Sequence, residues 1–212
     1  MLRLALAFLA LLGLTACGAD HTFAPQAQVD AARYVEGPPT YIVLYTGVND
    51  RNGSGAHSAL LVNASQRVLF DPAGTFTHPR APVQNDVHFG ITDSVLAAFL
   101  DYHARDTAAE KFHVVERKLY VSPQVAELIL QRVRANGAVP KAQCATSVSA
   151  ILRGVPGFES LPSTWFPVKL GDAFGQLPGV TTRIVTEEND GSQQHNVILV
   201  DTDAIRICRR GG

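Results

Sequence analysis

The chain has 212 residues, 46% of them hydrophobic, and its 18 lysines and arginines nearly balance its 19 aspartates and glutamates. This length suits one ordinary domain with extensions. The near-neutral charge and the lack of a basic stripe exclude a protein that binds nucleic acid through a positive surface.

The first sixteen residues predict an export signal. Arg3 supplies a positive start, and residues 4–14 form an apolar run without charge. A helix that crosses a bilayer needs about 20 apolar residues, so this run is too short for that. It has instead the length of the apolar region of a signal peptide, about 7–15 residues.

The end of this signal resembles the bacterial lipobox, in the sequence Leu14-Thr15-Ala16-Cys17. We therefore expect cleavage after residue 16 and acylation of Cys17, because two or three acyl chains on one residue anchor a protein stably. The mature chain would then be held on a bacterial cell membrane, facing the periplasm, and Gly18 after the cysteine favours the outer membrane. The alternative is an ordinary secretory signal in which Cys17 is only a neighbour of the cleavage site.

The mature chain divides into a spacer and a domain. Residues 17–39 are rich in Ala, Gln, Asp and Pro without sustained periodicity, and they predict a flexible tether. The folded domain is expected over residues 40–212.

Periodicity and turn residues predict the elements of this domain in chain order. Strands are expected at residues 41–46, 57–62, 67–71, 111–121, 181–185 and 196–200. Helices are expected at residues 93–105, 123–137, 144–153 and 166–174. Thr92 and Ser122 are suited to cap the first two helices, and four polar residues between the second and third strands predict a hairpin. Strands early, helices in the middle and strands again late indicate an α+β fold.

Cys144 is the most informative position for chemistry. It begins a predicted helix, after the loop at residues 138–143. A helix N-terminus carries partial positive charge and free N–H groups, which favour a thiolate and can also stabilise an oxyanion. The position therefore predicts a nucleophile, and the alternative is an inert cysteine in the core.

His57 is the best partner for that thiol because it opens an apolar strand after the glycines of residues 53–55. Asp71 ends the next strand, where its carboxylate can accept the other ring N–H and fix the tautomer. For both residues the alternative is a structural role. His57 would be a structural histidine, and Asp71 would form the turn before Pro72. His195 also precedes an apolar strand and is the reserve candidate for the base.

Three stretches, in this order, resemble the permuted branch of the NlpC/P60 papain-like superfamily, which has YiiX/YaeF-like and lecithin:retinol-acyltransferase-like members. They are GAHSALLV at residues 55–62, VLFDPAG at residues 68–74 and QCATSVSAIL at residues 143–152. The resemblance covers roughly residues 41–157. It implies a papain-like, circularly permuted fold in which an antiparallel sheet packs against helices.

The same resemblance implies roles for individual residues. Cys144 would be the nucleophile, His57 the base and Asp71 the polar residue that orients the base. Gln143 stands where such proteins often carry Asn or Asp, and it would either polarise a carbonyl at the oxyanion position or face solvent.

The expected function is a lipid-anchored thiol hydrolase of the cell envelope that cleaves amide bonds, with peptidoglycan peptides as the substrate that the resemblance suggests. A thiol acyltransferase on the same fold, or a non-catalytic lipoprotein that binds a partner or glycan, are the alternatives. A structural alternative is a disulfide between Cys144 and Cys208, which an oxidising compartment permits. No metal-binding or cofactor-binding motif is present. His88 is expected in a surface loop and His103 on the exposed side of its helix.

Overall fold

The computed structural model describes residues 18–106, 111–187 and 195–199, and it forms an α+β domain built on one antiparallel sheet. Within these residues the sheet has eight strands in the order β4-β5-β3-β2-β1-β6-β7-β8. The strands are β1 (Tyr41–Asn49), β2 (Gly55–Asn63), β3 (Arg67–Phe70), β4 (Val83–Gln84), β5 (Val87–His88), β6 (Phe112–Tyr120), β7 (Thr181–Glu187) and β8 (His195–Leu199). The helices are α2 (Gln26–Ala31), α3 (Asp93–His103), α4 (Pro123–Ala135), α5 (Cys144–Leu152) and α6 (Pro167–Gly175).

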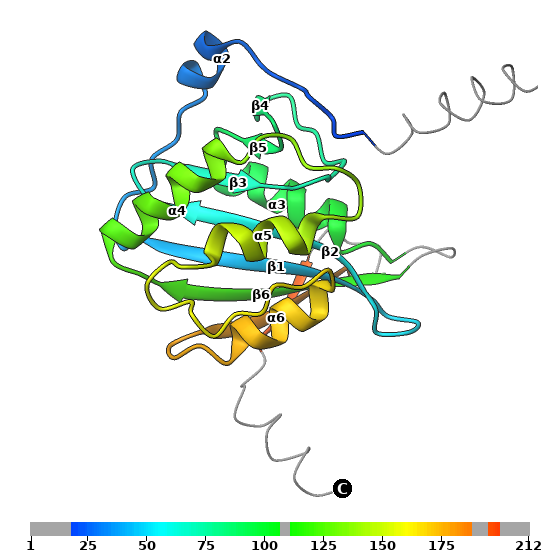
Figure 1. Ribbon diagram of the computed structural model, residues 1–212. Helices are drawn as coiled ribbons and strands as arrows, with labels where there is room; N and C mark the ends of the chain where they lie inside the picture. The colour runs from blue at the N-terminus through cyan, green and yellow to red at the C-terminus, as the bar shows by residue number, and fades with distance from the viewer. Residues whose placement is uncertain (1–17, 107–110, 188–194, 200–212) are drawn as a thin grey trace, which may run out of the picture.

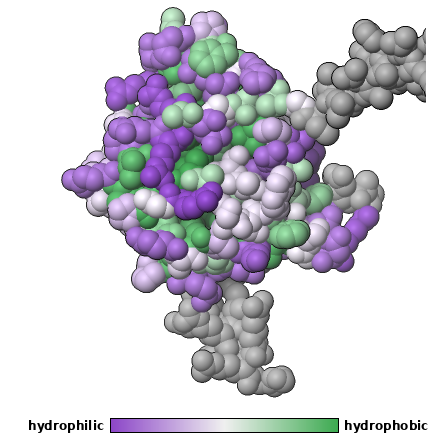
Figure 2. All heavy atoms as spheres, viewed as in Figure 1, coloured by the Kyte–Doolittle hydropathy of each residue, from purple (hydrophilic) through white to green (hydrophobic). Residues whose placement is uncertain are grey.

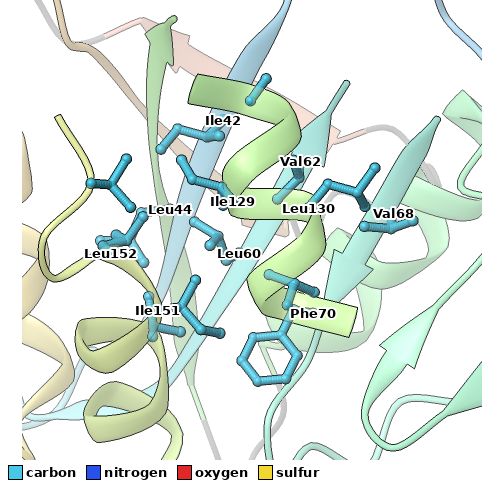
Figure 3. Packing of buried hydrophobic residues seen from close by; sticks show 14 of the residues in the cluster. Ile42, Leu44, Leu60, Val62, Val68, Phe70, Ile129, Leu130, Ile151 and Leu152 are labelled. Carbon is cyan, nitrogen blue, oxygen red and sulfur yellow. The ribbon is translucent and has the colours of Figure 1, made fainter. Parts of the chain in front are cut away.

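Strands β1, β2 and β3 each contain a continuous apolar run, at residues 41–45, 59–62 and 68–70, because both faces of the sheet are covered there. Successive side chains of a strand point to opposite faces, so each run contributes side chains to two separate cores, one on each face of the sheet. Ile42, Leu60 and Phe70 contribute to the core beneath α4, α5 and α6, as Figures 1 and 3 show. Val43 and Leu61 contribute to the core on the other face, which α3 covers.

The helices begin where their capping residues predict. The Thr92 side chain accepts the backbone N–H of Val95 at the start of α3, and Ser122 does the same for Val125 at the start of α4. In the space-filling view, hydrophilic side chains cover much of the outer face of α4 (Figure 2). The predicted helix is therefore confirmed, and it is amphipathic, with Ile129 among its buried residues.

All the predicted strands and helices are present, with ends shifted by a few residues, but three short elements were missed. They are helix α2 and the two-residue strands β4 and β5. Asn85 and Asp86 join β4 to β5, and both have positive φ, at 47° and 67°. A two-residue connection with both residues left-handed has the features of a type I′ hairpin, and Asn and Asp are among the few residues that tolerate it.

The prediction of a flexible tether over residues 17–39 is wrong for its described part. Residues 18–39 fold back onto the domain, and Val29 of α2 is only 3% exposed within the main core. The backbone N–H of Ala24 donates to Val83 of β4, and the backbone N–H of Arg67 donates to the carbonyl of Tyr34. A composition rich in polar residues did not reveal this, because the order comes from contacts with distant strands.

A buried cation strengthens the same attachment. Arg67 is 2% exposed, and its guanidinium donates to Glu36 at 2.7 Å, to Asp93 at 2.7 Å and to the carbonyl of Ile91 at 2.5 Å. The aromatic ring of Tyr34 lies beside the guanidinium, with its centroid 4.8 Å from the guanidinium carbon. A buried guanidinium with charged partners on several sides is costly to disrupt, so it fixes residues 34–36 against the sheet.

Candidate active site

The candidate nucleophile lies at the first residue of α5. Cys144 is buried, 7% exposed, and it is a free cysteine. The helix follows a turn in which the N–H of Gln143 donates to the carbonyl of Pro140. Ala142, the third residue of that turn, has a φ of 64°, which costs a non-glycine residue about 1 kcal/mol or more. The backbone is therefore strained immediately before the thiol.

Backbone donors surround the sulfur of Cys144. Gln143, the N-cap residue of α5, makes no side-chain capping bond, which leaves the first-turn N–H groups without that partner. The N–H groups of Ala145 and of Ser58 in β2 hydrogen-bond to the sulfur. Burial alone would raise the pKa of the Cys144 thiol, but the hydrogen bond and charge of His57, with these N–H groups, hold that pKa below its usual value.

His57 lies near the start of β2, with its side chain 17% exposed. Its Nε2 is 2.5 Å from Oδ1 of Asp71, which leaves Nδ1 as the ring nitrogen for the hydrogen bond with Cys144. Burial alone would lower the pKa of His57. The hydrogen bond and negative charge of Asp71, together with Cys144, outweigh burial and raise that pKa to about 10. The ring is therefore an imidazolium at neutral pH, and it faces a thiol whose pKa is lowered.

Asp71 follows β3 in a tight turn. The N–H of Gly74 donates to the carbonyl of Asp71, Pro72 is the second residue and Ala73 has a φ of 56°. Pro at the second position and a left-handed third residue are features of a type II turn. A Cβ on Gly74 would overlap the Asp71 carboxylate, so this glycine makes room for it. Burial raises the pKa of Asp71, but the hydrogen bond and positive charge of His57 lower it overall.

The unequal lengths of β2 and β3 bring these side chains together. The β2–β3 pairing runs from Asn63 with Arg67 to Leu60 with Phe70, so residues 55–59 of β2 continue without a partner from β3. Asp71 leaves the sheet at this point, and the N-terminus of α5 approaches the unpaired part of β2, where Ser58 donates to the sulfur. The site therefore lies at the opening between two strands.

Asp86 connects the two halves of the site. Its backbone carbonyl accepts the N–H of Asp71 at 2.9 Å. Its carboxylate Oδ2 accepts the N–H of Val139 at 2.8 Å and that of Ala73 at 3.2 Å. Because Val139 belongs to the loop before Cys144, one side chain of the β4–β5 turn fixes the carboxylate segment relative to the nucleophile loop.

Two further histidines lie beside the pair, and the expectations for both were wrong. The ring of His103 stacks on His57 at 5.3 Å between centroids and 13° between planes. His88 is 3% exposed, with Nε2 3.9 Å from Oδ2 of Asp71. Burial lowers the pKa of both rings, so both are neutral at neutral pH. The sequence held a signal for His103, which lies four residues after the buried Phe99 and thus on the inner face of α3.

The geometry of His57, Asp71 and His103 bears on metal binding. Within the described residues, these three form a group whose ligand atoms lie within 4.8 Å of one another. Two ligands on one tetrahedral Zn²⁺, with bonds of about 2.0–2.1 Å, stand more than 3 Å apart. The Nε2 to Oδ1 distance of 2.5 Å between His57 and Asp71 is instead that of a charge-assisted hydrogen bond, so this arrangement fits a shared proton better than an ion.

The remaining predicted site residues are placed as follows. Gln143 is half-buried beside Cys144, and among the described residues its side chain has no hydrogen-bond partner. His195 begins β8, which three strands separate from β2, and its side chain lies outside the description. Cys17 and Cys208 lie outside the described residues.

An exposed aromatic pair flanks the site. Trp165 and Phe166 are 58% and 68% exposed, and they follow Thr164, whose carbonyl accepts the Thr146 hydroxyl of α5. A pocket of about 500 Å³ lies between this segment and the β1–β2 turn, lined by Gly53, Ser54, Gly55, Phe166, Pro167, Val168, Lys169 and Asp172. Gly55 is two residues before His57 in β2, but Cys144, His57 and Asp71 are not among the residues that line this pocket.

No protein-family model, curated protein or solved structure matches this chain. In the described part of the chain, no helix has the length and apolar character that crossing a membrane requires.

Proposed function

We propose that this chain is a lipid-anchored cysteine hydrolase of the bacterial cell envelope, with a permuted papain-like fold, that cleaves amide bonds such as those of peptidoglycan peptides. One observation carries the catalytic part of the proposal: Cys144 at a helix N-terminus shares a hydrogen bond with His57, which is bound in turn to the buried carboxylate of Asp71. The sequence Leu14-Thr15-Ala16-Cys17 supports the anchor.

The chemistry would begin from a thiolate and an imidazolium. The sulfur of Cys144 attacks the carbonyl carbon of the amide, and the oxygen becomes an oxyanion. N–H groups of the first turn of α5, with Gln143 as a side-chain candidate, are placed to stabilise that charge. His57 gives its proton to the leaving nitrogen as the C–N bond breaks. His57 then takes a proton from the water that attacks the thioester carbonyl. The C–S bond breaks, the acid is released, and the Cys144 thiolate and the His57 imidazolium are restored.

Asp71 would act through His57 and not on the substrate. Its hydrogen bond to Nε2 fixes the ring orientation, and its charge keeps the ring protonated before attack. The neutral ring of His103 stacked on His57 keeps one side of this bond away from water.

The test is alkylation of the mature protein by iodoacetamide at neutral pH, in a Cys208→Ser background so that Cys144 is the reporting thiol. We expect rapid labelling that Cys144→Ser abolishes and His57→Ala slows at least tenfold. His113→Ala is the matched control, since His113 also pairs with an aspartate, Asp50, but lies outside the site. Labelling that is equally fast in His57→Ala would refute a coupled pair and favour a non-catalytic lipoprotein.

The hydrolase step needs its own assay. Peptidoglycan stem peptides incubated with the protein should release new amino groups, and Cys144→Ala should release none. A reactive Cys144 without peptide cleavage would reject this substrate class while leaving the thiol pair intact.

A further inference from the structure

The first described residues are fixed to the sheet within a few residues of Gly18. The N–H of Asn85 donates to the carbonyl of Thr22 at 2.9 Å, and the N–H of Ala24 donates to the carbonyl of Val83 at 2.8 Å. The carboxylate of Asp20 accepts the backbone N–H of Thr22 at 3.1 Å. We call residues 20–36 the strap, because they continue from this pairing through α2 to Glu36, which pairs with Arg67.

The strap is attached to the same hairpin that organises the site. Asn85, which donates to Thr22, is the chain neighbour of Asp86, which accepts the N–H of Asp71 and that of Val139. In Figure 1 the dark-blue start of the chain runs beside β4 and β5 on the right-hand side, where α5 also begins. The start of the described chain and the candidate nucleophile are therefore at one end of the domain.

Chain geometry limits how far the site can lie from Cys17. Thr22 is the fifth residue after Cys17, and five residue steps span at most about 18 Å. Paired residues of antiparallel strands have Cα atoms about 4.5–5.5 Å apart, so Thr22 and Asp71 are within about 15 Å of each other through the hairpin. The carboxylate segment of the site thus lies within about 33 Å of Cys17, whereas a flexible tether over residues 17–39 would reach about 75 Å.

We propose that the lipid on Cys17 holds the Cys144 site at the membrane surface, so that acyl or amide groups carried by membrane-bound molecules react faster than the same groups in solution. This inference rests on the lipidation and the reactive thiol of the proposed function. Phe23, 63% exposed and next to the fixed Thr22, presents an apolar side chain close to the anchor. An exposed aromatic beside a lipid anchor is suited to enter the interfacial region of a bilayer.

The test compares a reactive group on a lipid with the same group in solution. The lipidated chain with Cys208→Ser is reconstituted into phosphatidylcholine vesicles that contain phosphatidylethanolamine with an iodoacetyl group on its headgroup. A second version carries an insertion of about 20 glycine and serine residues between Gly18 and Ala19, ahead of every strap contact. Soluble iodoacetamide reports the intrinsic reactivity of Cys144 in both versions.

Effective concentration falls roughly as the −3/2 power of linker length, so the insertion should slow labelling by the lipid-borne group about tenfold. Labelling by soluble iodoacetamide should be unchanged. Equal lipid-borne rates in the two versions, with normal soluble labelling, would overturn this inference alone. A chain without acyl groups on Cys17, or a Cys144 inert to the soluble reagent, would overturn it together with the corresponding part of the proposed function.

Discussion

Replacing Asp71 by asparagine tests the electrostatic core of the site. Asp71 is 1% exposed, and its Oδ1 lies 2.5 Å from Nε2 of His57. Asn has nearly the same shape and keeps an acceptor oxygen for the ring N–H, so Asp71→Asn removes the charge while preserving the hydrogen bond. The change in the pKa of His57 then measures the effect of the Asp71 charge alone.

The size of the effect follows from Coulomb's law. Charge centres about 4 Å apart interact by about 4 kcal/mol at an effective dielectric constant of about 20. That energy corresponds to about 3 pKa units. The pKa of His57, about 10 in the native site, should therefore fall to about 7 in Asp71→Asn. The imidazolium that supports the thiolate is then only partly present at neutral pH.

The assay is the rate of Cys144 alkylation by iodoacetamide from about pH 4 to about pH 10, in the Cys208→Ser background. In the native chain the rate should rise below the usual cysteine pKa of about 8.5, because the pKa of Cys144 is lowered. In Asp71→Asn this rise should move to higher pH, and the rate near pH 6 should fall by roughly tenfold to a thousandfold.

Asp50→Asn is the matched control, since it removes the same charge from the His113–Asp50 pair. It should leave the rate profile of Cys144 in place. If Asp71→Asn also leaves the profile unchanged, Asp71 does not set the charge of His57, and the proposed role of the carboxylate is refuted.

Three further changes test packing around the site and the strap. Gly74→Ala places a methyl group on the Asp71 carboxylate, so it should slow Cys144 alkylation near neutral pH at least tenfold; an unchanged rate would show that Asp71 is not needed in this position. Arg67→Met removes the buried cation and leaves the carbonyl of Ile91 without its donor, so it should lower the free energy of unfolding, measured in urea, by about 1–3 kcal/mol. Val29→Ala should cost about 1–3 kcal/mol in the same measurement, because Val29 is buried; no loss would support the flexible tether.

Much of the fold could be read from local patterns. The apolar runs of β1 to β3, and the capping residues Thr92 and Ser122, correctly predicted strands and helices because each signal lies within a few residues of its element. The position of Cys144 at a helix start was also predictable, since the loop before it and the apolar face after it are local features.

Local patterns could not predict that residues 18–39 are fixed against the domain. Helix α2 has six residues, and β4 and β5 have two each, too few to show a period. Their stability comes from partners far along the chain, such as Thr22 with Asn85 and Glu36 with Arg67. Local composition therefore indicated a tether where long-range contacts form a fixed strap.

Local patterns in the sequence supply the residue types of the site: a thiol at a helix start, a histidine at a strand start and a carboxylate after the next strand. That these side chains meet is a consequence of how the domain folds. Their convergence depends on β3 ending at Phe70 while β2 continues to Gly55, and on Asp86 joining the Asp71 turn to the loop before Cys144. Strand register and a side chain that bridges distant loops are properties of the packed sheet, so no local pattern encodes them.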